Sequence, residues 1–169
     1  MNNVVISTQA IPLPSWSGAA VDFALNVLEE IKRDNWELSI MFCDDKTITE
    51  MNKEYRNKNE PTDVLSFNLG ETMDDGERAV FLPGDIVISL DTLRENSKYF
   101  ETSEDEELRR LIIHGILHLD GMDHCASIET GGQTENTLAI SGEPMLVLQE
   151  DILGKLKNKN IISLHGVKN

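Results

Sequence analysis

Hydrophobic positions recur along this chain with two different spacings, and each spacing predicts a different element. Alternation with a period of two predicts half-buried strands, whereas spacings of three and four predict helices. The pattern predicts strands over residues 2–8, 36–43, 63–69 and 84–90, and helices over 17–33, 44–56, 91–100, 103–119 and 143–156. Residues 70–83 are polar and contain Asp74-Asp75-Gly76, so we expect a loop or a hairpin excursion there.

This order of elements lacks the regular alternation of strand and helix that a parallel sheet requires. It predicts an α+β fold, with about four strands in a mixed sheet packed by about five helices. The 169 residues suit a single domain over 1–169. Within it, we expect residues 125–142, rich in Gly, Thr, Ser and Asn, to form a flexible loop, and the polar residues 157–169 to form a loose tail.

The helix predicted over 103–119 is the most apolar of the chain. Ser103 and Glu106 form a capping-box pattern at its start. In its second half the histidines are nearly the only polar residues, so we expect this helix to lie at the centre of the fold. Its expected buried face contains Leu108, Leu111, Ile112, Gly115 and Leu119.

Composition limits where the protein acts and what it binds. No apolar run is long enough to cross a bilayer, and the two cysteines do not form a disulfide framework, so we expect a cytoplasmic protein with no membrane partner. The formal net charge of −15 opposes any general attraction to nucleic acid. An RNA partner would therefore require a local basic patch.

Three of the four histidines lie within eleven residues, at His114, His118 and His124. The first two are four residues apart and share one helix face, while Gly121 allows the chain to leave the helix before His124. Three imidazoles suit one Zn2+ ion with an open position for water, on a central helix and its exit turn. Another transition metal fits the same nitrogens, and the structural alternative is a set of core histidines bonded to backbone.

The histidine spacing also matches H-E-x-x-H-x-x-G-x-x-H, the zinc-binding motif of metzincin proteases. Gly115 occupies the position of the catalytic glutamate. Peptide hydrolysis by that route is therefore disfavoured.

Four stretches of the chain resemble the YbeY family of endoribonucleases. They are H-G-I-L-H-L-D-G-M-D-H at 114–124, N-K-E-Y-R at 52–56, P-T-D-V-L-S-F at 61–67 and G-D-I-V-I-S at 84–89. The resemblance implies a zinc-dependent, single-strand-specific endoribonuclease that acts in late 16S rRNA 3′-end maturation and in 70S ribosome quality control. It implies small-subunit ribosomal RNA as partner, with small-subunit ribosomal proteins and a ribosome-associated GTPase as further partners, and no nucleotide cofactor.

The resemblance assigns His114, His118 and His124 to the metal, and Arg56 and His114 to catalysis. Arg56 also stands beside Lys53 and Lys58 on an acidic chain, and a guanidinium can hold a phosphate by two hydrogen bonds. The structural alternative is an exposed Arg56 paired with a nearby glutamate, Glu54 or Glu60.

Several alternatives stay open. Asp63 and Asp85 are each expected to cap a turn, pair with Arg56 or orient a ligand histidine. For the whole protein, one alternative is a zinc hydrolase acting on peptides or amides. Another is a ribosome-assembly factor with a structural metal, since an acidic protein is complementary to basic ribosomal proteins.

Overall fold

The computed structural model describes residues 1–122 and 144–163, and this part of the chain contains every predicted element. The elements follow in the order β1 (Asn3–Gln9), α1 (Ser17–Glu30), β2 (Glu37–Cys43), α2 (Asp45–Arg56), β3 (Val64–Asp74), β4 (Ala79–Ser89), α3 (Leu90–Tyr99), α4 (Glu104–Leu119) and α6 (Pro144–Lys155). The loop expected over 125–142 lies outside the described residues. Among the described helices, none is both long and apolar enough to cross a membrane.

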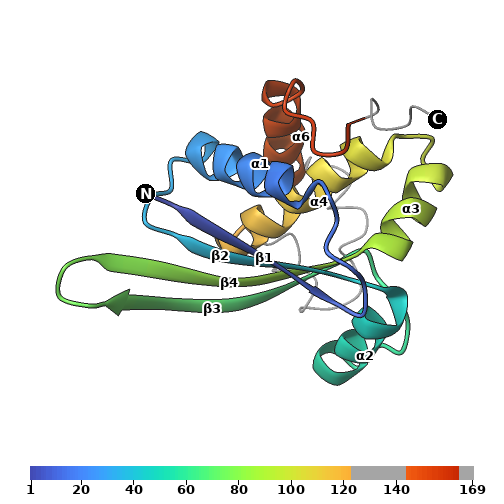
Figure 1. The fold of residues 1–169 in the computed structure, drawn as a ribbon, viewed down its shortest axis with the longest axis horizontal. Helices are drawn as coiled ribbons and strands as arrows, with labels where there is room; N and C mark the ends of the chain where they lie inside the picture. The colour runs from blue at the N-terminus through green and yellow to red at the C-terminus, as the bar shows by residue number, and fades with distance from the viewer. Residues whose placement is uncertain (123–143, 164–169) are drawn as a thin grey trace.

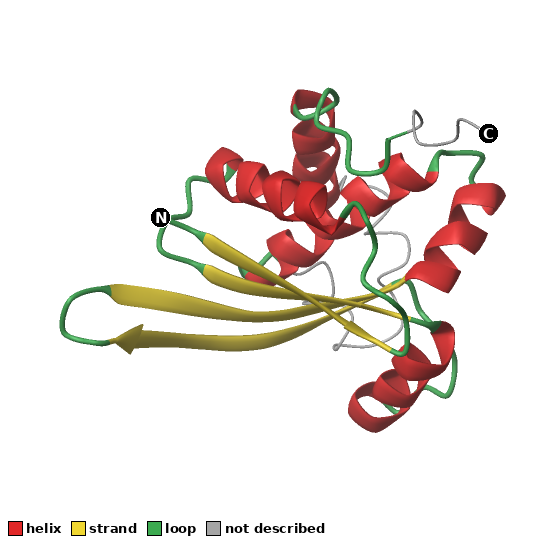
Figure 2. Cartoon of the chain, in the orientation of Figure 1, coloured by secondary structure: helices red, strands yellow, loops and turns green. Residues whose placement is uncertain are grey.

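The four strands form one mixed sheet in the order β1-β2-β4-β3. β1 and β2 are parallel, β2 and β4 are parallel, and β3 is antiparallel to β4. Helices α1, α4 and α6 lie on one side of this sheet and α2 lies on the other (Figures 1 and 2). The α+β prediction of a mixed four-stranded sheet packed by helices is confirmed.

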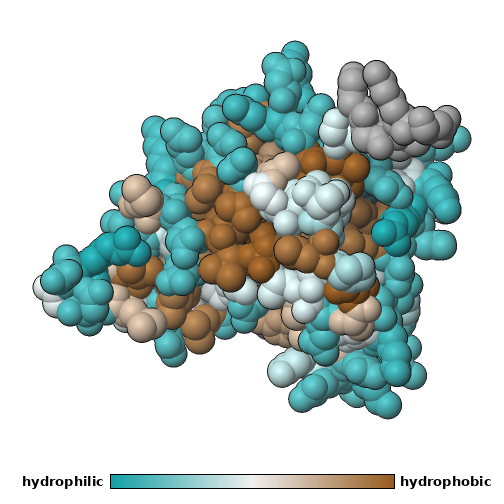
Figure 3. All heavy atoms as spheres, viewed as in Figure 1, coloured by the Kyte–Doolittle hydropathy of each residue, from teal (hydrophilic) through white to brown (hydrophobic). Residues whose placement is uncertain are grey.

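The core lies between the sheet and the helices α1, α4 and α6. Leu38, Ile40 and Phe42 are every second residue of β2; all three face these helices and are fully buried, as the period-two pattern predicted. A smaller apolar cluster of Cys43, Ile48, Leu65 and Val87 lies on the opposite face, under α2. Hydrophobic surface gathers over β1 and beside α1, whereas the tip of the hairpin formed by β3 and β4 and the region of α2 are largely hydrophilic (Figure 3).

Gly115 allows α4 to approach the sheet closely. A Cβ atom at this position would lie 2.8 Å from Cδ1 and 2.9 Å from Cγ2 of Ile86. Ile86 is fully buried in β4. Position 115 therefore faces the sheet, and the glycine that replaces the protease glutamate has a packing role.

Side-chain caps start three helices. Asp44 accepts from the Thr47 amide at 2.9 Å and Ser103 accepts from the Glu106 amide at 3.0 Å, both as predicted. For α3, the predicted cap at Asp91 is wrong. Ser89 caps this helix instead, because β4 runs directly into α3 and leaves its last residue at the N-cap position.

Residues 70–83 were predicted to form a loop or a hairpin excursion, and they form a β-hairpin. β3 and β4 continue to Asp74 and Ala79 and project beyond the helices (Figure 1). A register shift follows Asn68, and Gly84 has φ +137°. A Cβ atom at position 84 would lie 1.9 Å from the Phe67 carbonyl oxygen, so only glycine fits where β4 approaches β3 this closely.

The beginning of the predicted loose tail is attached to the fold. Asp105 of α4 accepts hydrogen bonds at 2.7 Å from the amides of both Ile161 and Ile162, and Arg109 pairs with Asp105 at 3.0 Å. Ile161 is itself buried. The prediction of a loose tail from residue 157 is therefore wrong as far as Ile162, because a buried ion pair on α4 binds that segment.

Candidate functional site

A pocket of about 800 Å³ brings the histidine pair and Arg56 together. α4 contributes His114 and His118, the end of α2 contributes Arg56, and β3 with the residues before it forms one wall. Its lining consists of Tyr55, Arg56, Thr62, Asp63, Val64, Leu65, Ser66, Phe67, Asn68, His114, His118 and Gly121. Segments far apart in the sequence thus meet at one site.

His114 and His118 lie one turn apart on α4, with ring centroids separated by 5.5 Å. Both side chains are half-buried. Two imidazoles that bind one zinc ion at about 2.1 Å from each nitrogen have ring centres roughly 5 Å apart, so the pair has a spacing that suits a shared ion.

Gln149 of α6 orients the first histidine. Its Oε1 lies 2.8 Å from Nδ1 of His114, and the glutamine is only 5% exposed. An amide oxygen is an acceptor, so Nδ1 carries the proton and Nε2 carries the lone pair that a metal ion would take. This contact is what a histidine ligand requires from its surroundings.

α4 ends in a turn that lies, in the sequence, just before the third predicted ligand. Gly121 has φ +87°, its amide donates to His118 O at 3.1 Å, and the Met122 amide donates to Leu117 O at 3.0 Å. The turn ends α4 as Gly121 predicted. His124 lies outside the described residues, and no group of three metal-binding side chains occurs among 1–122 and 144–163.

An ion pair between Arg33 and Asp120 links this turn to the end of α1. Nε and Nη2 of Arg33 donate to the two carboxylate oxygens of Asp120, at 2.6 and 3.2 Å. The hydrogen bond and charge of Asp120 raise the pKa of Arg33. Arg33 follows α1, so the pair links that helix to the turn that leads to His124.

Arg56 is the last residue of α2. The helix ends at Asn57 in a left-handed conformation, φ 56°, and the buried Asn52 donates to the Glu60 carbonyl at 2.9 Å. Within the described residues, Arg56 forms no ion pair with Glu54 or Glu60, so the structural alternative of such a pair is not realised. The loop conformation leaves Arg56 exposed at the pocket.

The two aspartates take different positions. Asp63 lines the pocket and accepts from the Val64 amide at 2.8 Å and from Nδ2 of Asn96 at 3.3 Å, which is a structural role at the start of β3. Asp85 neighbours Ile86 in β4 and therefore points to the opposite face of the sheet, away from the histidines.

Sequence reasoning missed Gln149 and the pair of Arg33 with Asp120. Gln149 had a signal, because it lies four residues after Met145 and three before Ile152, on the buried face of α6. A polar residue on such a face requires a partner. Arg33 had no comparable signal, since its partner is distant in the sequence.

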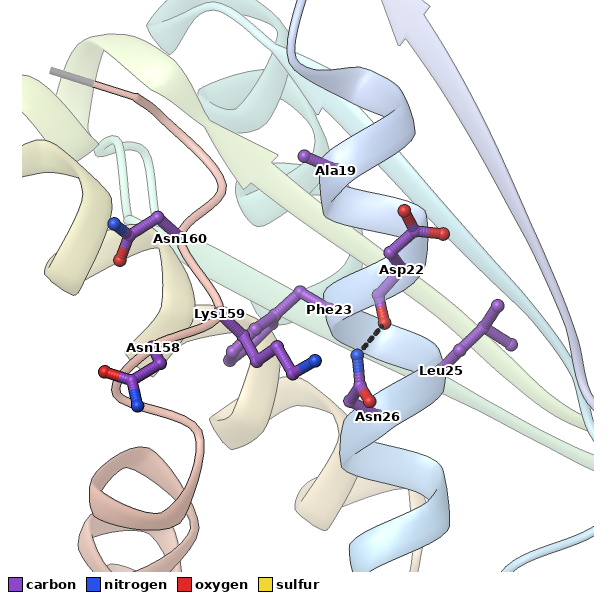
Figure 4. A pocket seen from close by; sticks show the side chains of 8 residues that line it. All are labelled: Ala19, Asp22, Phe23, Leu25, Asn26, Asn158, Lys159 and Asn160. Atoms are coloured by element: carbon purple, nitrogen blue, oxygen red, sulfur yellow. Dashed lines mark hydrogen bonds between the residues drawn. The ribbon is translucent and has the colours of Figure 1, made fainter. Parts of the chain in front are cut away.

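A separate cavity of about 480 Å³ lies between α1 and the segment after α6 (Figure 4). It is lined by Asp22, Asn26 and residues 158–160 among others, and Asn26 donates to the Asp22 carbonyl at 2.7 Å. Its lining contains no histidine, so it is distinct from the site on α4.

Fold and site define a class of protein: one α+β domain in which a histidine pair on one helix shares a pocket with an arginine at the end of another helix. The family model described as "Endoribonuclease YbeY" matches residues 6–137. The chain belongs to the YbeY family.

Curated relatives agree with this assignment. The chain is 43% identical to the endoribonuclease YbeY of Treponema pallidum over 156 residues, which cover 92% of this chain and 90% of that protein. It is 41% identical to the endoribonuclease YbeY of Treponema denticola, over 95% of this chain and 97% of that one. The solution structure of TM1509 from Thermotoga maritima has the same fold, with a TM-score of 0.56 and 21% identity over 98% of this chain and 99% of that chain.

Proposed function

We propose that this protein is a metal-dependent endoribonuclease that cleaves single-stranded RNA in the pocket of His114, His118 and Arg56. The observation that carries the proposal is that the arginine and both histidines line one pocket although they come from different elements. The names of the curated relatives supply RNA as the substrate class.

The metal would be held by His114, His118 and His124. The spacing of the first two rings and the hydrogen bond that Nδ1 of His114 donates to Gln149 support this assignment. A bound zinc ion, or another transition metal, would supply a Lewis acid that activates water and shares the charge on the phosphate. The same contact with Gln149 would hold His114 in the one tautomer that suits this role.

Arg56 would bind the scissile phosphate. A guanidinium donates two parallel hydrogen bonds to phosphate oxygens and stabilises the charge that develops on them. Lys53 and Lys58 lie within three residues of Arg56 in the sequence and would add positive charge near it, on a chain of net charge −15. These three cations would offset part of the repulsion between an RNA substrate and an acidic protein.

We extend the proposal to late 16S rRNA 3′-end maturation and 70S ribosome quality control. Small-subunit rRNA would be the substrate, and small-subunit ribosomal proteins and a ribosome-associated GTPase would be partners. Binding to basic ribosomal proteins would offset the repulsion between RNA and an acidic protein.

The test combines metal analysis with cleavage of a single-stranded oligoribonucleotide. We expect His118→Ala to lose both metal and cleavage, and Arg56→Ala to keep the metal but lose cleavage. Arg78→Ala, at the exposed hairpin tip, is the matched control and should cleave normally. The termini of the products separate attack by water on phosphorus from attack by the ribose 2′-hydroxyl.

Two results would contradict the proposal. One is activity on a peptide panel that is lost in His118→Ala, with no activity on RNA. The other contradicts only the role in rRNA maturation: a His114→Ala protein that folds, lacks cleavage activity and still restores normal rRNA ends in cells without the wild-type protein.

A further inference from the structure

An exposed aromatic residue, Tyr55, lies where two cavities meet. One is the histidine pocket, and the other is a cavity of about 420 Å³ on the opposite face of the sheet. Tyr55 and Phe67 line both cavities. The two cavities therefore adjoin at this aromatic pair.

The Tyr55 ring is held from one side and accessible from the other. It contacts the Phe67 ring edge-to-face, with centroids 5.0 Å apart and an interplanar angle of 66°. Despite this contact, Tyr55 is 62% exposed. An oriented, accessible ring next to Arg56 in the sequence can stack on a nucleobase.

The cavity on the opposite face suits a base better than a phosphate. Met41, Met51 and Val87 supply apolar surface, and none of its described lining residues is basic. The polar side chains in it are Ser7, Ser39 and Asp85. A carboxylate repels phosphate but accepts hydrogen bonds from the exocyclic amino group of a base.

We infer that Tyr55 is a stacking platform for an unpaired RNA base next to the phosphate held by Arg56, and that the adjoining cavity receives this base. The inference rests on the proposed function. An acidic protein gains little affinity from phosphate contacts, so base stacking would supply a large part of its affinity for single strands. Such a platform would favour unpaired RNA, because a base within a duplex must first lose its own stacking and pairing.

The test measures binding of a fluorescein-labelled single-stranded oligoribonucleotide by anisotropy, in excess EDTA so that no cleavage occurs. We expect Tyr55→Ala to weaken binding about 5- to 100-fold, the contribution of one stacked base. Tyr55→Phe and Tyr55→Trp should bind within about twofold of wild type, because stacking requires the ring and not the hydroxyl.

The chain provides a matched control in its other tyrosine. Tyr99 is 81% exposed and contacts Phe100 edge-to-face, also at 5.0 Å, but it is outside both cavities. Tyr99→Ala should leave RNA binding unchanged.

With metal present, Tyr55→Ala should raise KM and largely preserve kcat, whereas Arg56→Ala should lower kcat.

A base analogue gives a second readout. A 2-aminopurine placed along the oligoribonucleotide should be quenched at one position by the wild type, and this quenching should be lost in Tyr55→Ala. The inference alone would be overturned if a folded Tyr55→Ala protein cleaved RNA and matched the wild type in RNA affinity, KM and quenching. Absence of both RNA binding and cleavage in the wild type would overturn the proposed function itself, and binding of a basic peptide at Tyr55 in place of RNA would overturn the assignment of the cavity.

Discussion

Replacement of Gln149 by alanine should weaken metal binding without unfolding the protein. The substitution removes the acceptor 2.8 Å from Nδ1 of His114. Loss of a buried partner of a histidine ligand lowers metal affinity about 10- to 100-fold, which corresponds to about 1.4 to 2.7 kcal/mol. The apoprotein should also lose about 1 to 3 kcal/mol, because a buried hydrogen bond is broken.

The two effects are separable by linkage. At a free zinc concentration 100 times the wild-type Kd, metal should stabilise the wild type by about 2.7 kcal/mol. The same concentration should stabilise Gln149→Ala by about 1.4 kcal/mol if its affinity is tenfold weaker, and by about 0.4 kcal/mol if it is hundredfold weaker. Denaturant unfolding with and without zinc measures this difference, and competition with a fluorescent chelator measures Kd directly.

Two further variants make the result specific. Gln149→Glu keeps an acceptor and adds a charge that strengthens the bond, so its zinc affinity should equal or exceed that of the wild type. Gln9→Ala, on an exposed position of β1, should change neither quantity. Equal zinc affinity of folded Gln149→Ala and wild type would refute the role assigned to this glutamine.

Three other experiments test the packing of the fold and the ion pair beside the site. Gly115→Ala should destabilise the protein in denaturant unfolding, because overpacking against Ile86 costs about 1 to 3 kcal/mol and the helix propensity of alanine offsets at most about 1 kcal/mol of this. Ile86→Val in the same chain should recover part of the loss, and a protein stabilised by Gly115→Ala would contradict the close approach of α4 to the sheet. Arg33→Ala should lower the free energy of unfolding by only about 0.5 kcal/mol, because the arginine is half exposed. It should also lower zinc affinity, because it loosens the turn before the third predicted ligand. Unchanged zinc affinity in chelator competition would argue against that link. Burial raises the pKa of Cys43 to about 12, so in a Cys125→Ser background its thiol should resist a disulfide reagent at neutral pH until the protein is denatured; rapid labelling of the native protein would show that this region is accessible.

Local physics explains what could be predicted for the site. His114 and His118 share a face because four residues make about one helical turn, and this relation holds wherever the helix packs. Gly121 ends the helix because it adopts a positive φ at no steric cost. Asp44 and Ser103 cap their helices through amides three residues away, so their roles were also contained in short stretches.

Contacts between distant segments explain what was missed. Ser89 caps α3 because a strand runs into it without a loop, a continuity that propensity does not encode. Asp105 binds the amides of Ile161 and Ile162, so a polar tail became part of the core. Gln149 reaches His114 only because α6 packs against α4.

The sequence by itself determined the strands and helices, the helix caps at Asp44 and Ser103, and the histidine pair on one helix face, since each depends on residues only a few positions apart. Tertiary structure decided that Arg56 shares the pocket of that pair, because the antiparallel pairing of β3 with β4 places the chain after α2 beside α4. It also showed that Gly115 is required by the side chain of Ile86, which contacts it across the core. The physical reason is common to both: long-range packing selects which of many locally equivalent side chains meet, and no local period contains that choice.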